Sequence, residues 1–201
     1  PWITVDDAYA GQLAERRRLI AERPGKVLAW SDGAGPALAA LMEAGRAALD
    51  AHPAFGLSGD LVRCPDGQAA VLDGHRVLES LGITLAEDLC VLEKRGAEHV
   101  LVAACLCFPA GWTLSEKIGR PLGRIHRPVP AYDAGIARRV QRFLDGVQRA
   151  TPLWRANLHG ADSAALFQPL REGDPKPRAG SPPRYWRAER QTVLRLTGTA
   201  V

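Results

Sequence analysis

The chain has 201 residues, of which 46% are hydrophobic and 24% are charged, so it is long enough to bury one sizeable core. No run approaches the roughly 20 apolar residues that a membrane-spanning helix needs, and the first residues lack the pattern of a signal peptide. The formal net charge of +4 allows anion binding but is too small to indicate a nucleic-acid-binding protein. Four cysteines without the spacing of a disulfide framework favour a reducing, cytoplasmic location.

Residues 1–86 are predicted to form an N-terminal extension of helices and a hairpin that packs on the rest of the chain. Helical spacing of apolar residues, a Pro-Gly stop and a Pro-Asp-Gly turn predict these elements in order. They are a helix over residues 7–23, a strand over 26–30, a helix over 36–49, a hairpin over 59–74 and a helix over 75–82.

Residues 87–201 are predicted to form the core, an antiparallel sheet with helices inserted between its strands. The strongest signal is a hairpin over residues 87–94 and 99–108, whose second arm is apolar on both faces, as in a strand covered on both sides. A helix is expected from Asp133, and further strands over residues 152–158 and 184–196. The last residues resemble the approach to another strand, so the core is expected to be incomplete at its C-terminal end. The fold class is therefore α+β.

The last predicted strand places an arginine on an apolar face. Alternation puts Trp186 and Arg190 on one side of the strand and Glu189 on the other. A buried guanidinium needs an anion or several acceptors. Its partner is either a carboxylate of the protein itself or the carboxylate or phosphate of a bound ligand. The same two alternatives apply to Arg155 on the neighbouring strand.

His126 is followed by two prolines, Pro128 and Pro130, which disfavour both helix and sheet and predict a stiff, non-repetitive segment. A lone loop histidine is more often a surface or hydrogen-bonding residue than a ligand. Here, however, the two prolines would hold the imidazole in one position, and several cations lie near it in the sequence. An iron porphyrin with two propionates requires this combination of an axial nitrogen and cations at its edge. The cations are Lys117, Arg120, Arg124 and Arg127. Of the other histidines, His52, His75 and His99 are expected to be solvated.

Three blocks of the sequence resemble the haem-dependent oxidative N-demethylase family. They read "LCFPAGWTLSEKIGRPLGRIHRPVP", "WRANL" and "WRAERQTVLRL". The resemblance spans roughly residues 87–196 and is weaker upstream. It implies a PAS-like sheet that holds haem b, and oxidative demethylation, with O2, of a small secondary amine such as dimethylamine. The products are a primary amine and formaldehyde, and the electrons come from NADPH through a separate flavin-containing reductase.

The resemblance also assigns roles to residues. It makes His126 the proximal iron ligand, Arg190 a haem-pocket anion partner, and Glu189 an acid that attracts an ammonium substrate. Because the last two lie on opposite strand faces, they share one pocket only if the strand twists or ends at its rim. The arginine-rich side of the helix over residues 133–150 either docks an acidic reductase surface or is merely solvated.

A second class of function stays open. PAS-like haem domains also sense gases or redox state, and the chain could be a sensor or a non-catalytic haem-binding protein. No output domain accompanies the core in this sequence, which favours the enzyme.

Overall fold

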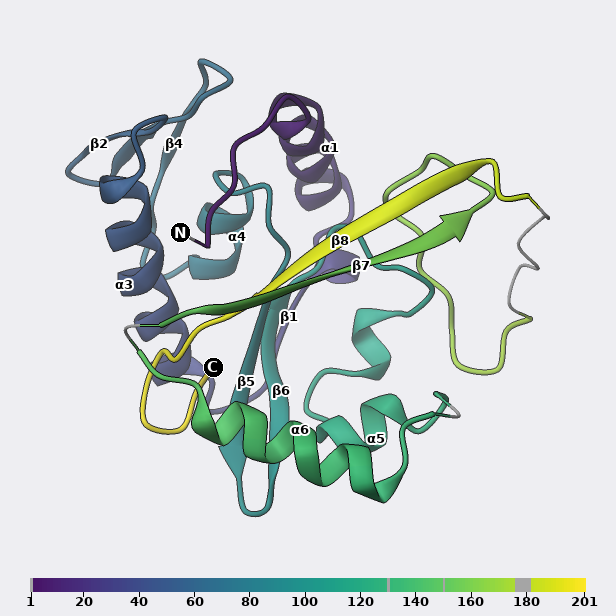
Figure 1. Ribbon diagram of the computed structural model, residues 1–201. Helices are drawn as coiled ribbons and strands as arrows, with labels where there is room; N and C mark the ends of the chain where they lie inside the picture. The colour runs from purple at the N-terminus through teal and green to yellow at the C-terminus, as the bar shows by residue number, and fades with distance from the viewer. Residues whose placement is uncertain (1, 130, 150, 176–181) are drawn as a thin grey trace.

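A three-stranded antiparallel sheet lies at the centre of the fold (Figure 1), and the computed structural model describes residues 2–129, 131–149, 151–175 and 182–201. Its strands are β1 (Leu28–Trp30), β6 (Glu98–Cys105) and β5 (Leu89–Arg95), in the order β1-β6-β5. The end of the chain extends this sheet beside β5. Leu92 and Val201 exchange two backbone hydrogen bonds of 2.8 and 2.9 Å, and Lys94 N donates to Thr199 O at 2.7 Å.

One face of the sheet is covered by α1 (Tyr9–Glu22), α3 (Gly35–Ala51) and α4 (Val77–Gly82). Their apolar stripes pack with Val102 and Cys105 of β6 in the largest buried cluster. Gly45 of α3 allows a close approach to α4, since a Cβ there would lie 2.8 Å from Leu81 Cδ2. This helical layer and the sheet form the main core.

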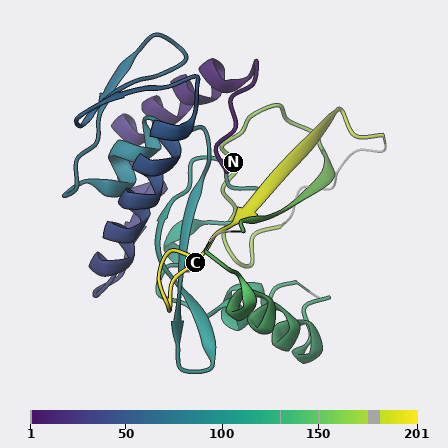
Figure 2. The ribbon, with the colours of Figure 1, turned by 60° about the vertical axis from the view of Figure 1, so that its left-hand side comes forward.

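The opposite face is covered by η1 (Leu114–Glu116), α5 (Leu122–His126) and α6 (Ala134–Gly146). Leu101 and Ala104 of β6 pack with Leu114, and Leu122 packs with Leu144 and the C-terminal Val201 in a neighbouring cluster. Figure 2 shows α6 on the other side of the β5–β6 hairpin from α1 and α3. β6 is thus buried between two layers, as its apolar sequence predicts.

Two small elements complete the N-terminal part. A second sheet packs beside α3, and a single helical turn joins α1 to β1. These elements are β2 (Gly56–Ser58), β3 (Leu61–Arg63), β4 (Ala69–Val71) and α2 (Pro24–Val27).

A long two-stranded ribbon crosses in front of the sheet in Figure 1. It pairs β7 (Leu153–Ala161) with β8 (Tyr185–Val193) in antiparallel register, with Ala156 opposite Arg190 and Asn157 opposite Glu189. Most of its side chains are exposed on both faces. The ribbon is therefore held mainly by its own ladder of hydrogen bonds.

A buried polar network joins α1 to the sheet. Arg16 is fully buried; its Nε donates to Gly82 O at 3.1 Å and its Nη1 to Asp88 Oδ1 at 2.5 Å. Its Nη2 lies 3.2 Å from Cys105 Sγ. The Asp88 carboxylate also accepts from the backbone N–H of Cys107, at 2.7 Å, and of Phe108, at 2.9 Å. This network fixes the angle at which α1 meets β6.

The α+β class is confirmed, and so is the hairpin predicted over residues 87–108. The strand predicted over residues 26–30 is shorter, because the first residues form α2. The PAS-like arrangement and the boundary at residue 86 stay predictions, although β1 from the N-terminal part pairs with β6. No helix in the described ranges is long and apolar enough to cross a membrane, and all four cysteines are free.

Candidate functional site

The residues predicted to form one site lie on two different parts of the fold. His126, Lys117, Arg120 and Arg124 belong to the segment of η1 and α5 that covers the sheet. Arg155, Glu189 and Arg190 belong to the β7–β8 ribbon.

His126 is the last residue of the five-residue helix α5, so the prediction of a non-repetitive segment is wrong. The helix fits between the prolines because Pro121 precedes its first turn and Pro128 follows its end, positions where a missing N–H costs little. One helical turn brings the His126 ring back to the Leu122 carbonyl, and Nδ1 lies 2.9 Å from that oxygen. The ring also stacks on Tyr132, with centroids 4.5 Å apart and an interplanar angle of 18°.

This contact fixes the tautomer of His126. A carbonyl oxygen can only accept, so Nδ1 must carry the proton, and in the neutral ring the lone pair is on Nε2. Metal-bound histidines are commonly oriented in this way, by an N–H bond from the other ring nitrogen to a backbone carbonyl. The ring is half-buried. Its donor chemistry and orientation therefore fit an axial ligand of haem iron.

Two of the predicted rim cations already share an internal carboxylate, Glu172. Lys117 is buried and donates to Glu172 Oε1 at 2.7 Å and to the carbonyl of Ile125 at 3.3 Å. Arg124 binds both oxygens of the same carboxylate, at 2.9 and 3.0 Å. Hydrogen bonds from Arg124 and Lys117 lower the pKa of Glu172 to about 2. Arg120 is exposed, and its backbone carbonyl accepts from Leu101 N.

On the ribbon, the predicted alternation is confirmed but the expected burial of Arg190 is not. Its guanidinium lies 5.3 Å from the centroid of the Trp154 ring and donates to Thr4 Oγ1 at 2.8 Å. Thr4 N in turn donates to Glu87 Oε1 at 2.7 Å. Burial raises the pKa of Glu87. Arg190 thus ties the exposed ribbon to the N-terminal segment.

The other ribbon face holds Glu189 and Arg155. Glu189 forms an ion pair of 3.2 Å with Arg187 Nε, and Arg155 Nε donates to Gln191 Oε1 at 2.8 Å. Arg187 also donates to the carbonyls of Leu166 and Phe108. As the register requires, Glu189 and Arg190 point to opposite sides of the ribbon.

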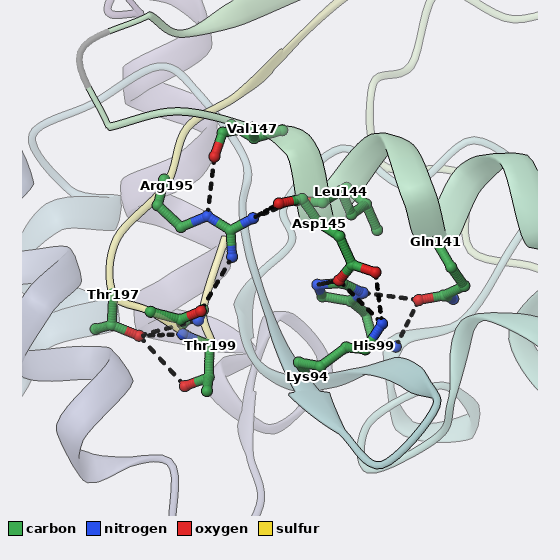
Figure 3. A network of polar contacts seen from close by, with 11 residues as sticks. Lys94, His99, Gln141, Leu144, Asp145, Val147, Arg195, Thr197 and Thr199 are labelled. Carbon is green, nitrogen blue, oxygen red and sulfur yellow. Dashed lines mark hydrogen bonds and ion pairs between the residues drawn. The ribbon is translucent and has the colours of Figure 1, made fainter.

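His99 was missed by the sequence reasoning, and the prediction that it is solvated is wrong. It is fully buried on β6 and faces α6 (Figure 3). Its Nδ1 lies 2.7 Å from Gln141 Oε1, and its Nε2 is 3.9 Å from Asp145 Oδ1. Asp145 is held by Lys94 Nζ at 2.8 and 2.9 Å. The apolar run after His99 was the signal that could have placed it inside the sheet.

A cavity of about 780 Å3 lies between α2, the segment from Pro109 to Leu114 and the segment from Phe167 to Asp174. Its lining includes none of the predicted site residues. Among the described residues, His126 has a donor nitrogen of the kind that an iron ligand needs, and the predicted cations Lys117 and Arg124 next to it are engaged by Glu172.

Comparison with protein families gives a match over residues 1–201 to the family described as haem-dependent oxidative N-demethylase, alpha subunit-like. The match includes the three sequence blocks that carry the resemblance, and it extends over the N-terminal part as well. The family's name indicates a haem-dependent oxidoreductase, and it describes an alpha subunit, which is the term for one chain of a protein with several. The chain belongs to the haem-dependent oxidative N-demethylase alpha subunit-like family.

Proposed function

We propose that this chain binds haem b through His126 Nε2 and catalyses oxidative N-demethylation of a small secondary amine such as dimethylamine. The observation that carries the proposal is the hydrogen bond between His126 Nδ1 and Leu122 O, which leaves Nε2 as the donor nitrogen. The family match supports haem as the cofactor.

The chain's residues would hold the cofactor in defined ways. Tyr132 and the Leu122 carbonyl fix the plane of the His126 ring, which limits the rotation of an axial ligand. Lys117, Arg120 and Arg124 are candidates for the two haem carboxylates. For Lys117 and Arg124 this requires an exchange of Glu172 for another anion of the same charge, a substitution that keeps the cations neutralised.

The ribbon would supply the remaining groups. Arg155 and Arg190, which point to opposite faces of the ribbon, are candidates for additional anion contacts, and Glu189 for attraction of a protonated amine. These roles require the ribbon and the α5 segment to line one pocket. Glu189 now pairs with Arg187, so an amine at this position would compete with that ion pair.

When bound, haem accepts electrons and activates O2. In the overall reaction dimethylamine, O2, two electrons and two protons give methylamine, formaldehyde and water. The N-methyl carbon is oxidised, and one oxygen atom leaves in formaldehyde and the other in water. We propose a flavin-containing, NADPH-dependent reductase as the electron donor. The exposed arginines of α6 are a candidate surface for its acidic face, and they are Arg138, Arg139 and Arg142.

Titration with hemin tests the ligand. The unaltered protein should give a shifted, saturable Soret band at one equivalent, and His126→Ala should lose or shift that band. His75→Ala, which changes an exposed histidine at the start of the α4 segment, is the matched control and should behave like the unaltered chain. Identical spectra for His126→Ala and the control would remove His126 as the ligand.

Turnover separates the enzyme from a haem-based sensor. With haem bound and a chemical or enzymatic electron source, the enzyme should release formaldehyde and methylamine in equal amounts from dimethylamine under O2. A haem-loaded protein that binds O2 but releases neither product would instead be a sensor or a non-catalytic haem protein.

A further inference from the structure

The cavity lined by α2, η1 and the segment around Phe167 has an apolar floor and aromatic side walls. Leu106, Pro109 and Leu114 form the buried floor, and Trp112 and Phe167 stand half-buried at the sides. Its volume of about 780 Å3 lies within the range of about 300–1,000 Å3 that small-molecule sites occupy. Such a floor favours a ligand with a flat, apolar body.

The acidic residues at the rim are already engaged. Glu22 Oε2 accepts from Arg18 Nη1 at 2.5 Å, on the outer side of α1. Asp174 Oδ2 accepts from the backbone N–H of Arg171 at 3.1 Å, within its own turn. These contacts do not remove the two negative charges, so the rim holds two carboxylates beside the three basic residues described next.

The basic residues at the rim differ from the acidic ones in their exposure and in their contacts. Arg23, Lys26 and Arg171 are exposed, and within the described ranges none of their side chains forms an ion pair with a carboxylate. The Arg23 guanidinium lies 5.9 Å from the centroid of the Phe167 ring, so it stands directly beside the aromatic wall. With three cations and two carboxylates, the rim is net positive above an apolar floor.

We propose that this cavity is a second binding site, separate from the His126 site, which takes a flat aromatic anion. The aromatic body lies against Trp112, Phe167 and the floor, and its carboxylate, sulfonate or phosphate group meets Arg23 and Lys26. The net positive rim favours an anion over a protonated amine, so we assign the amine substrate elsewhere. The lining holds no imidazole or thiol, so it also lacks the usual axial ligands of haem iron.

A pair of dyes that differ in charge tests this site. 8-Anilinonaphthalene-1-sulfonate is a flat aromatic anion, and N-phenyl-1-naphthylamine has the same rings without the sulfonate. Both should bind the haem-free protein, with fluorescence rising at saturation. The variant Arg23→Gln/Lys26→Gln should weaken binding of the sulfonate about tenfold and leave the neutral dye unchanged, because two exposed ion contacts are lost. Trp112→Leu should weaken both dyes.

Two controls separate this cavity from the rest of the surface. Arg46→Gln removes a cation that pairs with Asp60 elsewhere and should change neither dye. The double variant Trp154→Ser/Trp186→Ser removes the exposed aromatic residues of the ribbon and should leave the tight sulfonate site intact. The rim residues are exposed, so their variants are expected to fold, and circular dichroism checks this.

Several results would overturn the proposal. Equal weakening of both dyes in the rim variant would mean that charge plays no part. Loss of the tight site in the ribbon variant would place the dye on the ribbon. Displacement of the dye by one equivalent of hemin in the His126→Ala protein would make the cavity the haem site. If hemin does not bind at His126 but the dyes bind as before, the proposed function is contradicted and this second site is unaffected.

Discussion

Replacement of Arg16 by methionine tests how much the buried network between α1 and the sheet contributes to stability. Methionine fills most of the same volume without charge, so the change removes three polar contacts and leaves the packing largely intact. Breaking a buried ion pair by removing one partner typically costs about 3–5 kcal/mol, because the remaining charge is left uncompensated.

The surroundings of Arg16 and Asp88 determine how much stability is lost, within that range, when each is replaced. If Arg16 is removed, Asp88 keeps its hydrogen bonds from Cys107 N and Phe108 N, and its side chain is 21% exposed. Arg16→Met should therefore lower the free energy of unfolding by about 3 kcal/mol, at the low end. If Asp88 is changed to Asn instead, a fully buried guanidinium is left without its counter-ion, and the loss should lie near about 5 kcal/mol.

Urea unfolding followed by tryptophan fluorescence measures both losses, with an unchanged slope as the sign that the transition stays two-state. For a chain of this size a loss of about 3 kcal/mol lowers the melting temperature by about 6–12 °C. Arg18→Met on the same helix removes two exposed ion pairs, with Glu15 and Glu22, and is the matched control, with little change expected. A loss below about 1 kcal/mol in Arg16→Met, or a larger loss there than in Asp88→Asn, would refute this account of the network.

Two further predictions concern glycine packing and pH. Gly82→Ala should cost about 1–3 kcal/mol in urea unfolding, because the new Cβ would lie 2.6 Å from Cys105 Sγ and 2.9 Å from Ile20 Cδ1. Gly11→Ala in α1 should instead add up to about 1 kcal/mol, since nothing lies within 4 Å of its added methyl; a loss there would contradict the packing. The pKa of Glu172 is lower in the folded protein than in the unfolded chain. The stability that its ion pairs contribute is therefore fully present above its ordinary pKa and is lost as pH falls toward about 2. Carboxyl NMR should show that low midpoint, and Arg124→Gln should raise it; an unmoved midpoint would exclude Arg124 as its main cause.

The elements that the sequence predicts well are those whose own residues specify them. The β5–β6 hairpin follows from an uninterrupted apolar arm, and α6 from an apolar stripe behind Asp133, whose side chain caps Ile136 N at 2.7 Å. The alternation of β8 also holds, so Glu189 and Arg190 were correctly placed on opposite faces.

The parts that were missed depend on contacts between distant segments. Helix α5 forms between two prolines because its residues pack against β6 and α6, which no local pattern reveals. Glu172 reaches Lys117 and Arg124 across some fifty positions of sequence, and the exposed state of Arg190 follows from the ribbon standing away from the core. His99 is buried because α6 folds over it; its place beside the hairpin turn favours a solvated side chain, and only the apolar run that follows it indicates a buried one.

The β7–β8 ribbon has a consequence for how the molecule moves. Trp154, Leu158 and Trp186 are 65%, 62% and 67% exposed on one of its faces, so separating the ribbon from the body uncovers little additional apolar surface. Elements with few buried contacts open at a small fraction of the free energy of global unfolding. The ribbon is therefore expected to open at a lower free energy than the sheet and its helices, and its restraints include the bonds from Arg190 to Thr4 and from Arg187 to the carbonyls of Leu166 and Phe108.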